Sequence, residues 1–455
     1  MMGNLLSARQ QLSTWDLHTL YIDDMSSYFF GNFLRIICST FSQLCYFDYE
    51  TKSVQIYKAP WYIKDNPRFV FRGLLLDTSR HYLPIDVIKQ IIESMSYAKL
   101  NVLHWHIIDE ESFPLEVPSY PKLWNGAYTK WERYTVEDAS EIVRHPCNGR
   151  SRCPRSCRVM IYTADKNRRP LPGELTGEPR FNLNIIFVYI ITTFNLGLVI
   201  ECWIPSLNIR KIFPFELFHL GGDEIERKIF HCASPFDFMV LGGLYFILIP
   251  VYMLDTSVEH RLNDHNMTAK DAYQYFVLKA QEIAILKDWT PVNWEETFNS
   301  FPSKLNPRTV IHNWLGPGVC LKAVAKGFKC IFSNQGAWYL DHLDVPWNEV
   351  YNAEPLEGIN NVSEKNLVLG GEVCMWGETA DASNVQQTIW PRAAAAAERL
   401  WSKREAVSVR IDNSTVLPRY HYFRCLLNSR GVHAAPATNY YARRPPTGPG
   451  SCYDQ

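Results

Sequence analysis

The chain has 455 residues, of which 46 are basic and 47 acidic, so its formal net charge is −1. A content of 47% hydrophobic and 20% charged residues is that of a globular protein that buries a core. Such a balanced charge does not favour a nucleic acid or an anionic membrane surface as the partner. The 14 Trp and 24 Tyr are by default part of the core, but exposed aromatic rings can also hold sugars.

From residue 72 onward, short apolar segments alternate with segments of helical period, which predicts parallel strands joined by crossover helices. The helices expected between them include 85–100, 269–287 and 384–401. Seven strands in this order favour a (β/α)8 TIM barrel, an α/β fold, with one strand not yet placed. A doubly wound open sheet is the alternative, but no glycine-rich phosphate loop supports it. The predicted strands are 73–77, 102–109, 215–221, 291–294, 309–314, 330–333 and 367–375.

Aromatic, acidic or basic side chains follow nearly every predicted strand. Because the carboxyl ends of barrel strands meet on one face, we expect these side chains to converge on one site. A site of indole rings and carboxylates, without a phosphate loop or a visible metal set, suits a carbohydrate. The residues concerned are Arg80, Trp105, His106, Asp109, Asp223, Glu224, Trp294, Glu295, Trp314, Trp338, Tyr339, Trp376 and Glu378.

The segment FELFHLGGDEI, residues 215–225, places Asp223 and Glu224 after two glycines at the end of an apolar strand. Side chains on a regular strand alternate between its faces, so two adjacent acids cannot both stay buried within it. Glycines at the strand end let the backbone or a ligand approach closely. Paired carboxylates there could divide the work of acid and base between them. The alternative is a polar strand end that leads into a loop.

Several longer segments resemble one family: RGLLLDTSRHYLP, NVLHWHIIDEESFP, FELFHLGGDE, TPVNWEE, SNQGAWYLDHL, and GGEVCMWGETAD followed by WPRAAAAAERLW. They resemble the catalytic barrel of the β-hexosaminidases, glycoside hydrolase family 20, over about 45–145, 208–225 and 261–455. The resemblance implies removal of terminal β-linked N-acetylglucosamine or N-acetylgalactosamine from glycans, with retention of configuration. The nucleophile is the substrate's own acetamido oxygen, so no cofactor, metal or nucleophilic carboxylate is expected.

The resemblance also assigns the catalytic roles. Glu224 is the general acid that protonates the leaving oxygen and then, as a base, activates water. Asp223 orients the acetamido group and stabilises the positive charge that develops on its nitrogen. Tyr339 donates a hydrogen bond to the acetamido oxygen.

Further residues bind the substrate by the same resemblance. Arg80 and Glu378 bind sugar hydroxyls, and Asp109 belongs to a relay behind the acid. Each has a structural alternative, since Arg80 could close an ion pair and Asp109 could cap a helix. His104 and His106 are expected to pack or to support the site. The acetamido methyl group and the sugar ring lie between Trp294, Trp314 and Trp376.

Compartment signals are mixed, because twelve scattered cysteines do not settle the redox environment. The resemblance implies a disulfide between Cys425 and Cys452. Sequons at Asn266, Asn361 and Asn413 favour a glycosylated protein. The resemblance therefore places the chain in the secretory pathway: vacuole or lysosome, extracellular, or membrane-associated. Residues 1–24 lack a signal peptide's basic and apolar regions. Members of the family often dimerise, so a homodimer is an option.

Residues 145–207 and 225–260 depart from the family pattern. No histidine lies between Pro146 and Phe218, so the third barrel strand is uncertain and the expected histidine partner of Asp109 is missing. Both stretches contain apolar segments of about bilayer-spanning length, about 20 residues. Two spanning helices would have to leave a closed barrel on both sides of its fourth strand, so membrane association is kept only as an alternative. We interpret the stretches as products of altered splicing or of a mispredicted gene model.

The expected organisation has three parts. A remnant of an N-terminal α/β domain covers 1–66, and the catalytic barrel covers 67–420, interrupted by the two unusual stretches. A C-terminal extension at 421–455 packs on the barrel. The predicted function is a β-N-acetylhexosaminidase. The alternative is a catalytically impaired sugar-binding homologue or a misassembled splice product.

Overall fold

Eight parallel strands close into a barrel in the order β10-β3-β4-β5-β6-β7-β8-β9. The computed structural model describes residues 45–48, 50–56, 66–109, 111–118, 121–145, 158–163, 209–223, 266–403 and 413–437. The barrel confirms the predicted fold class, and each of the seven predicted strands is present. The strands are β3 (Phe71–Asp77), β4 (Val102–Ile108), β5 (Arg158–Thr163), β6 (Leu217–His219), β7 (Thr290–Trp294), β8 (Val310–Asn313), β9 (Lys329–Phe332) and β10 (Val368–Met375).

The third barrel strand is β5, which lies inside the first unusual stretch. Its register with β4 runs from Val102 opposite Arg158 to Ile108 opposite Thr163, and Tyr162 pairs with His219 of β6. The third strand, which the sequence left uncertain, is therefore present and paired on both sides. The segment RVMIYT is rich in β-branched and aromatic residues that suit a strand, and backbone pairing needs no family signature.

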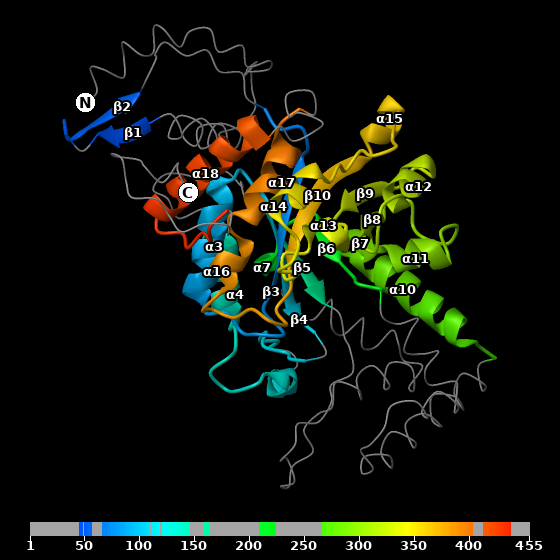
Figure 1. Ribbon diagram of the computed structural model, residues 1–455. Helices are drawn as coiled ribbons and strands as arrows, with labels where there is room; N and C mark the ends of the chain where they lie inside the picture. The colour runs from blue at the N-terminus through cyan, green and yellow to red at the C-terminus, as the bar shows by residue number, and fades with distance from the viewer. Residues whose placement is uncertain are drawn as a thin grey trace, which may run out of the picture.

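Helices pack around the barrel, with α3, α4 and α16 on one side of the strands and α10, α11 and α12 on the other (Figure 1). Capping boxes begin α4, at Thr135 and Asp138, and α10, at Thr268 and Asp271. The helices are α3 (Ile85–Tyr97), η1 (Pro121–Gly126), α4 (Val136–Arg144), α7 (Ile209–Ile212), α10 (Ala269–Leu286), α11 (Glu295–Ser300), α12 (Val319–Ala325), α13 (Gln335–Trp338), α14 (Trp347–Asn352), α15 (Val362–Lys365), α16 (Val385–Ile389), α17 (Arg392–Trp401) and α18 (Asn413–Ser429).

The helix predicted over 384–401 is in fact two helices. α16 ends at Ile389, and α17 begins after Pro391. Proline has no N–H to donate and disfavours helical backbone in the residue before it, so the helical pattern is interrupted there. The alanines of α17, residues 393–397, are buried. Small side chains let this helix lie close to its neighbours.

The two ends of the chain are described only in part. Within 1–66, strands β1 (Cys45–Asp48) and β2 (Ser53–Ile56) form an antiparallel pair, and the boundary at residue 66 stays a prediction. α18 packs through Tyr420, whose ring stacks on Trp347 with centroids 4.7 Å apart. None of the helices that the structure describes combines the length and apolar character that a membrane crossing requires. The apolar segments within 164–208 and 224–265 lie outside the described residues.

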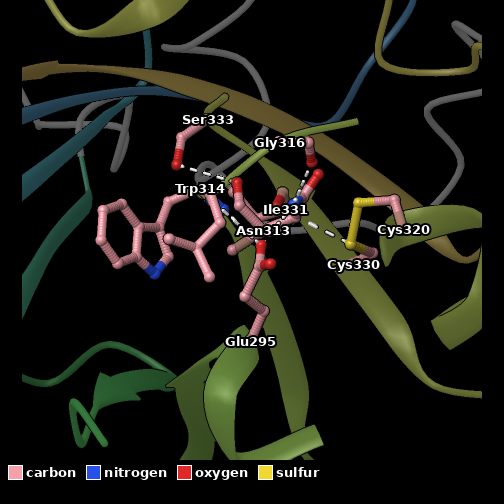
Figure 2. Close-up of a disulfide and its surroundings, with 9 residues drawn as sticks. Glu295, Asn313, Trp314, Gly316, Cys320, Cys330, Ile331 and Ser333 are labelled. Atoms are coloured by element: carbon pink, nitrogen blue, oxygen red, sulfur yellow. Dashed lines mark hydrogen bonds between the residues drawn. A yellow bond between two sulfur atoms is a disulfide. The ribbon is translucent and has the colours of Figure 1, made fainter. Parts of the chain in front are cut away.

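A disulfide joins Cys320 of α12 to Cys330 of β9 (Figure 2). The sequence did not indicate this pair. Cys425 is also disulfide-bonded, but Cys452 lies outside the described residues, so their pairing stays a prediction. Figure 2 shows the Cys320–Cys330 bond beside Asn313, with the ring of Trp314 pointing away from it.

We expect replacement of both Cys320 and Cys330 by Ala to lower the free energy of unfolding by about 2–3 kcal/mol. The disulfide closes a loop with a sequence separation of 10, and its loss frees the unfolded chain from that restriction. Urea denaturation of parent and variant measures the difference, which should disappear when both are denatured in a reducing buffer. Equal unfolding free energies in the oxidising buffer would contradict the expectation.

Candidate active site

β6 leads into a glycine turn that carries Asp223 out of the barrel wall. Gly221 and Gly222 have φ of 68° and 103°, a region that side-chain-bearing residues rarely adopt. The Tyr273 hydroxyl donates a 2.6 Å hydrogen bond to the Gly222 carbonyl, and a Cβ on Gly222 would lie 2.6 Å from Thr297. Both glycines are therefore required by the turn. Asp223 follows it, half-buried at the strand end, as the sequence predicted.

Asp223 acts electrostatically on two described neighbours. Burial, and next the charge of Asp223, raise the pKa of Glu296 to about 8. Burial also raises the pKa of Tyr339 well above its ordinary value, with Cys374 and Asp223 adding to the effect. Asp223 thus lies in one site with Tyr339. Glu224 lies outside the described residues, so its role stays a prediction.

Four aromatic rings form a closed set at the carboxyl ends of β7, β8, β9 and β10. The ring centroids of Trp294 and Trp314 are 6.2 Å apart, and those of Trp294 and Trp376 are 6.3 Å apart. Tyr339 lies 6.2 Å from Trp314, nearly parallel to it, and 6.0 Å from Trp376. We call these four residues the aromatic cage. It brings together every aromatic residue that the resemblance assigns to the substrate.

Arg80 lies beside the cage, with its guanidinium 5.1 Å from the ring of Trp376. Its nitrogens lie 2.9 Å from Asp77, 3.1 Å from Asp109 and 3.2 Å from Glu378. Burial would lower the pKa of Arg80, but these three carboxylates raise it above its ordinary value. Asp77 and Asp109 are buried, whereas the Glu378 side chain is 52% exposed. Glu378 is therefore the carboxylate of this group that a ligand can reach.

Asp109 has a histidine partner, contributed by its own strand. His106 Nε2 lies 2.9 Å from Asp109 Oδ2, and both side chains are buried. The relay histidine expected from the third strand is missing, since none lies between Pro146 and Phe218, but the expectation that no histidine supports Asp109 is wrong. His106 also contacts the Trp376 ring edge-on, with centroids 5.0 Å apart. Asp109 thus connects the Arg80 group to the wall of the cage.

A polar layer lies beneath the cage, made by His104, His219, His312 and Glu372. These residues come from alternate strands, β4, β6, β8 and β10, as in the layered interior of such barrels. The Trp294 ring stacks on His312 with centroids 4.2 Å apart. Burial and neighbouring imidazoles lower the pKa of His219 and His312 well below the ordinary value, so both are neutral. The layer supports the cage.

Three members of this layer are the one set among the described residues that could hold a metal ion. The ligand atoms of His104, His312 and Glu372 lie within 4.8 Å of one another. However, His104 Nδ1 lies only 2.7 Å from Glu372 Oε1, the distance of a charge-assisted hydrogen bond. We therefore interpret His104 and Glu372 as a hydrogen-bonded pair, with His312 Nε2 3.4 Å from the same carboxylate oxygen.

Two carboxylates of the site, Glu296 and Asp341, escaped the sequence analysis, and a third, Glu295, was noted only as a strand-end residue. Glu295 is buried and accepts hydrogen bonds from the Asn313 side chain and, at 2.8 Å, from the Trp314 backbone (Figure 2). Glu296 accepts the Trp314 indole N–H. Asp341 adds to the raised pKa values of Tyr339 and Glu378, although burial is the main cause of both. The segments WEE and WYLDHL contain these acids and could have indicated them.

The predicted glycosylation sites lie on the surface where the structure describes them. Asn266 and Asn361 are exposed. The Asn361 side chain accepts hydrogen bonds from the backbone and hydroxyl of Ser363 at 3.0 and 2.8 Å. Asn413 is the first residue of α18, and its side chain lies outside the described part. Modification of all three stays a prediction.

Comparisons with known proteins agree with this geometry. The catalytic domain of glycosyl hydrolase family 20 matches residues 69–149 and 207–404. Beta-hexosaminidase 1 of Arabidopsis thaliana is 61% identical over 428 residues, which are 91% of this chain and 71% of the relative. Beta-hexosaminidase 3 of the same plant is 46% identical over 419 residues, 91% of this chain and 72% of the relative.

A solved structure supports the same fold. Chitobiase of Flavobacterium johnsoniae is 25% identical and superposes with a TM-score of 0.60. The match covers 87% of this chain but 56% of the chitobiase, so this chain spans little more than half of that protein. Sequence and fold lead to the same assignment: the chain belongs to glycosyl hydrolase family 20.

Proposed function

We propose that this chain is a β-N-acetylhexosaminidase, which removes terminal non-reducing β-linked N-acetylglucosamine or N-acetylgalactosamine from oligosaccharides and glycoconjugates. Family membership and 61% identity to a named beta-hexosaminidase support a glycosidase. The aromatic cage carries the proposal, because it stands beside Arg80 and Asp223 as a sugar pocket would require. The identity to named hexosaminidases does not favour the impaired sugar-binding homologue.

The proposed chemistry is retaining and substrate-assisted. The acetamido oxygen of the sugar attacks the anomeric carbon while Glu224 protonates the leaving oxygen, and the same residue later activates water. Asp223 stays ionised and stabilises the positive charge on the acetamido nitrogen. Tyr339 keeps its proton because its pKa is raised, so its hydroxyl can donate to the acetamido oxygen.

The remaining residues hold the sugar in this proposal. The three tryptophans of the cage enclose the acetamido methyl group and cover the ring. Glu378 accepts hydrogen bonds from sugar hydroxyls, and Arg80 keeps its charge next to them. Asp109 and His106 support Arg80 from behind. The proposed reaction uses side chains of this chain, the acetamido group of the substrate and water, and it requires no cofactor.

We expect the thiazoline analogue of the cyclised intermediate to bind at least about 100-fold more tightly than N-acetylglucosamine, because it resembles the closed, charged state. Tyr339→Phe should lose about tenfold of this preference, since it removes one hydrogen bond to the acetamido group. Inhibition of nitrophenyl β-N-acetylglucosaminide hydrolysis measures both affinities. Tyr275→Phe, on the exposed face of α10, is the matched control and should keep the parent's preference. Equal affinities of the parent for the two ligands would exclude substrate assistance.

The proposal also covers the cellular location and the assembly of the protein. The disulfide Cys320–Cys330 and the exposed sequons Asn266 and Asn361 support passage through an oxidising secretory compartment. A vacuolar, lysosomal or extracellular destination follows only from the resemblance. The same holds for a homodimer, whereas membrane association has only the apolar stretches behind it and stays the less favoured alternative.

A further inference from the structure

Trp314 is held at two points by two adjacent acids at the start of α11. Its backbone N–H donates to Glu295 Oε2 at 2.8 Å. Its indole Nε1 lies 3.1 Å from Oε1 and 3.1 Å from Oε2 of Glu296. Glu295 therefore fixes where the residue sits, and Glu296 fixes how the ring is turned within the aromatic cage.

In the described part of the chain, Glu296 faces two acids and one hydrogen-bond donor. Asp223 approaches from the end of β6, Glu295 precedes it on α11, and Trp314 follows β8. Burial and the charge of Asp223 raise the pKa of Glu296 to about 8. Burial raises the pKa of Glu295 as well, but the hydrogen bonds that Asn313, Trp314 and Leu315 donate to it oppose this effect. Of these three acids, Glu296 is the one placed to carry a proton.

We propose that Glu296 is a positioning residue that orients the Trp314 indole and must stay protonated while a sugar occupies the cage. The proposal rests on the proposed function, because it takes the sugar to lie against Trp314. A bound sugar displaces water from the half-buried carboxyl of Glu296, and loss of water disfavours its charged form. Proton binding and sugar binding are then coupled, and each favours the other.

The sign of the pH dependence follows from this coupling. Below the pKa of Glu296 its carboxyl group already carries the proton, so no free energy of sugar binding is used to protonate it. Above it, the sugar must either draw in a proton or bind beside a second negative charge next to Asp223. Sugar affinity should therefore be level up to about pH 8 and then fall, approaching about tenfold per pH unit. Glu296→Gln keeps an acceptor for the indole and cannot ionise, so its affinity should not fall in this way.

The experiment compares the affinity of the full chain for N-acetylglucosamine, by titration calorimetry from pH 6 to about pH 9.5, with that of three variants. Glu296→Gln should hold its affinity within about threefold where the parent loses about tenfold or more. The affinity of Glu296→Ala should also stay level with pH, but it should be weaker at every pH, because the Trp314 ring is no longer held. Glu282→Gln removes an exposed acid paired with Lys279 and should follow the parent. A Glu296→Gln profile that falls like the parent's would overturn the proposal.

A second readout works without any sugar. The tryptophan emission of the parent minus that of Trp314→Phe should titrate near pH 8, and Glu296→Gln should remove this titration. If the parent binds no N-acetylglucosamine but this titration is present, the proposed function fails while the protonation of Glu296 stands. If the emission difference does not titrate, the proposal on Glu296 is wrong whatever the chain binds.

Discussion

Replacing Glu224 with Gln is expected to lower the turnover of chitobiose by about 10²–10⁴-fold, the usual contribution of general acid–base catalysis. The amide cannot protonate the leaving sugar, which departs poorly as an anion. It has nearly the size of the carboxyl group, so the affinity for N-acetylglucosamine should change little. Single-turnover kinetics with chitobiose, and calorimetry with the monosaccharide, measure the two effects separately.

The leaving group provides the control for this variant. A nitrophenyl glycoside carries a leaving group that needs less protonation, so Glu224→Gln should cleave it with a smaller loss. Asp223→Asn should instead slow both substrates, because it removes the charge that stabilises the cyclised intermediate whatever group leaves. A Glu224→Gln variant that cleaved chitobiose at the parent rate would show that another residue is the acid.

Replacing Arg80 with Ala is expected to lower the free energy of unfolding by about 3–5 kcal/mol and to weaken sugar binding by about 10–100-fold. The change leaves Asp77 and Asp109 buried without the cation that they share. It also frees Glu378, whose carboxylate is expected to bind sugar hydroxyls. Urea denaturation and calorimetry with N-acetylglucosamine measure the two losses.

Arg68→Ala is the matched control for Arg80. Arg68 forms a comparably buried ion pair with Glu354 at 2.6 Å, and it precedes the start of β3, whereas Arg80 follows the end of that strand. Its loss should cost stability without changing the affinity for the sugar. If Arg80→Ala lost stability but bound sugar like the parent, the group would be structural only, which is the alternative that the sequence left open for Arg80.

The barrel could be predicted because strands buried on both faces appear as short apolar runs between helical patterns. β5 could not, since RVMIYT lies in a region without the expected motif, and only its pairing with β4 identifies it as a barrel strand. The break between α16 and α17 was in fact indicated by Pro391, and a stricter use of that residue would have found it.

The sequence predicted which residues at the strand ends belong to the site, but not which of them contact one another. The residues of the aromatic cage could be named because they follow successive strands. The contact between His106 and Asp109 was missed because His106 was expected only to pack or to support the site in general, although the two lie three residues apart. Glu296 was missed, and Glu295 was given no role, because their partners Asn313 and Trp314 lie at the end of the next strand and just after it. Such contacts depend on barrel closure, which no local pattern specifies.

The polar layer beneath the cage has a consequence for the behaviour of the barrel in acid. His219 and His312 are neutral because burial and their neighbours lower their pKa values, whereas in the unfolded chain they titrate at the ordinary value, about 6.5. The unfolded state therefore takes up more protons than the folded state as the pH falls below about 6.5. The free energy of unfolding therefore has its full contribution from these two histidines above that pH, and it decreases below that pH. The interior of the barrel, directly under Trp294, thus contributes to the acid sensitivity of the fold.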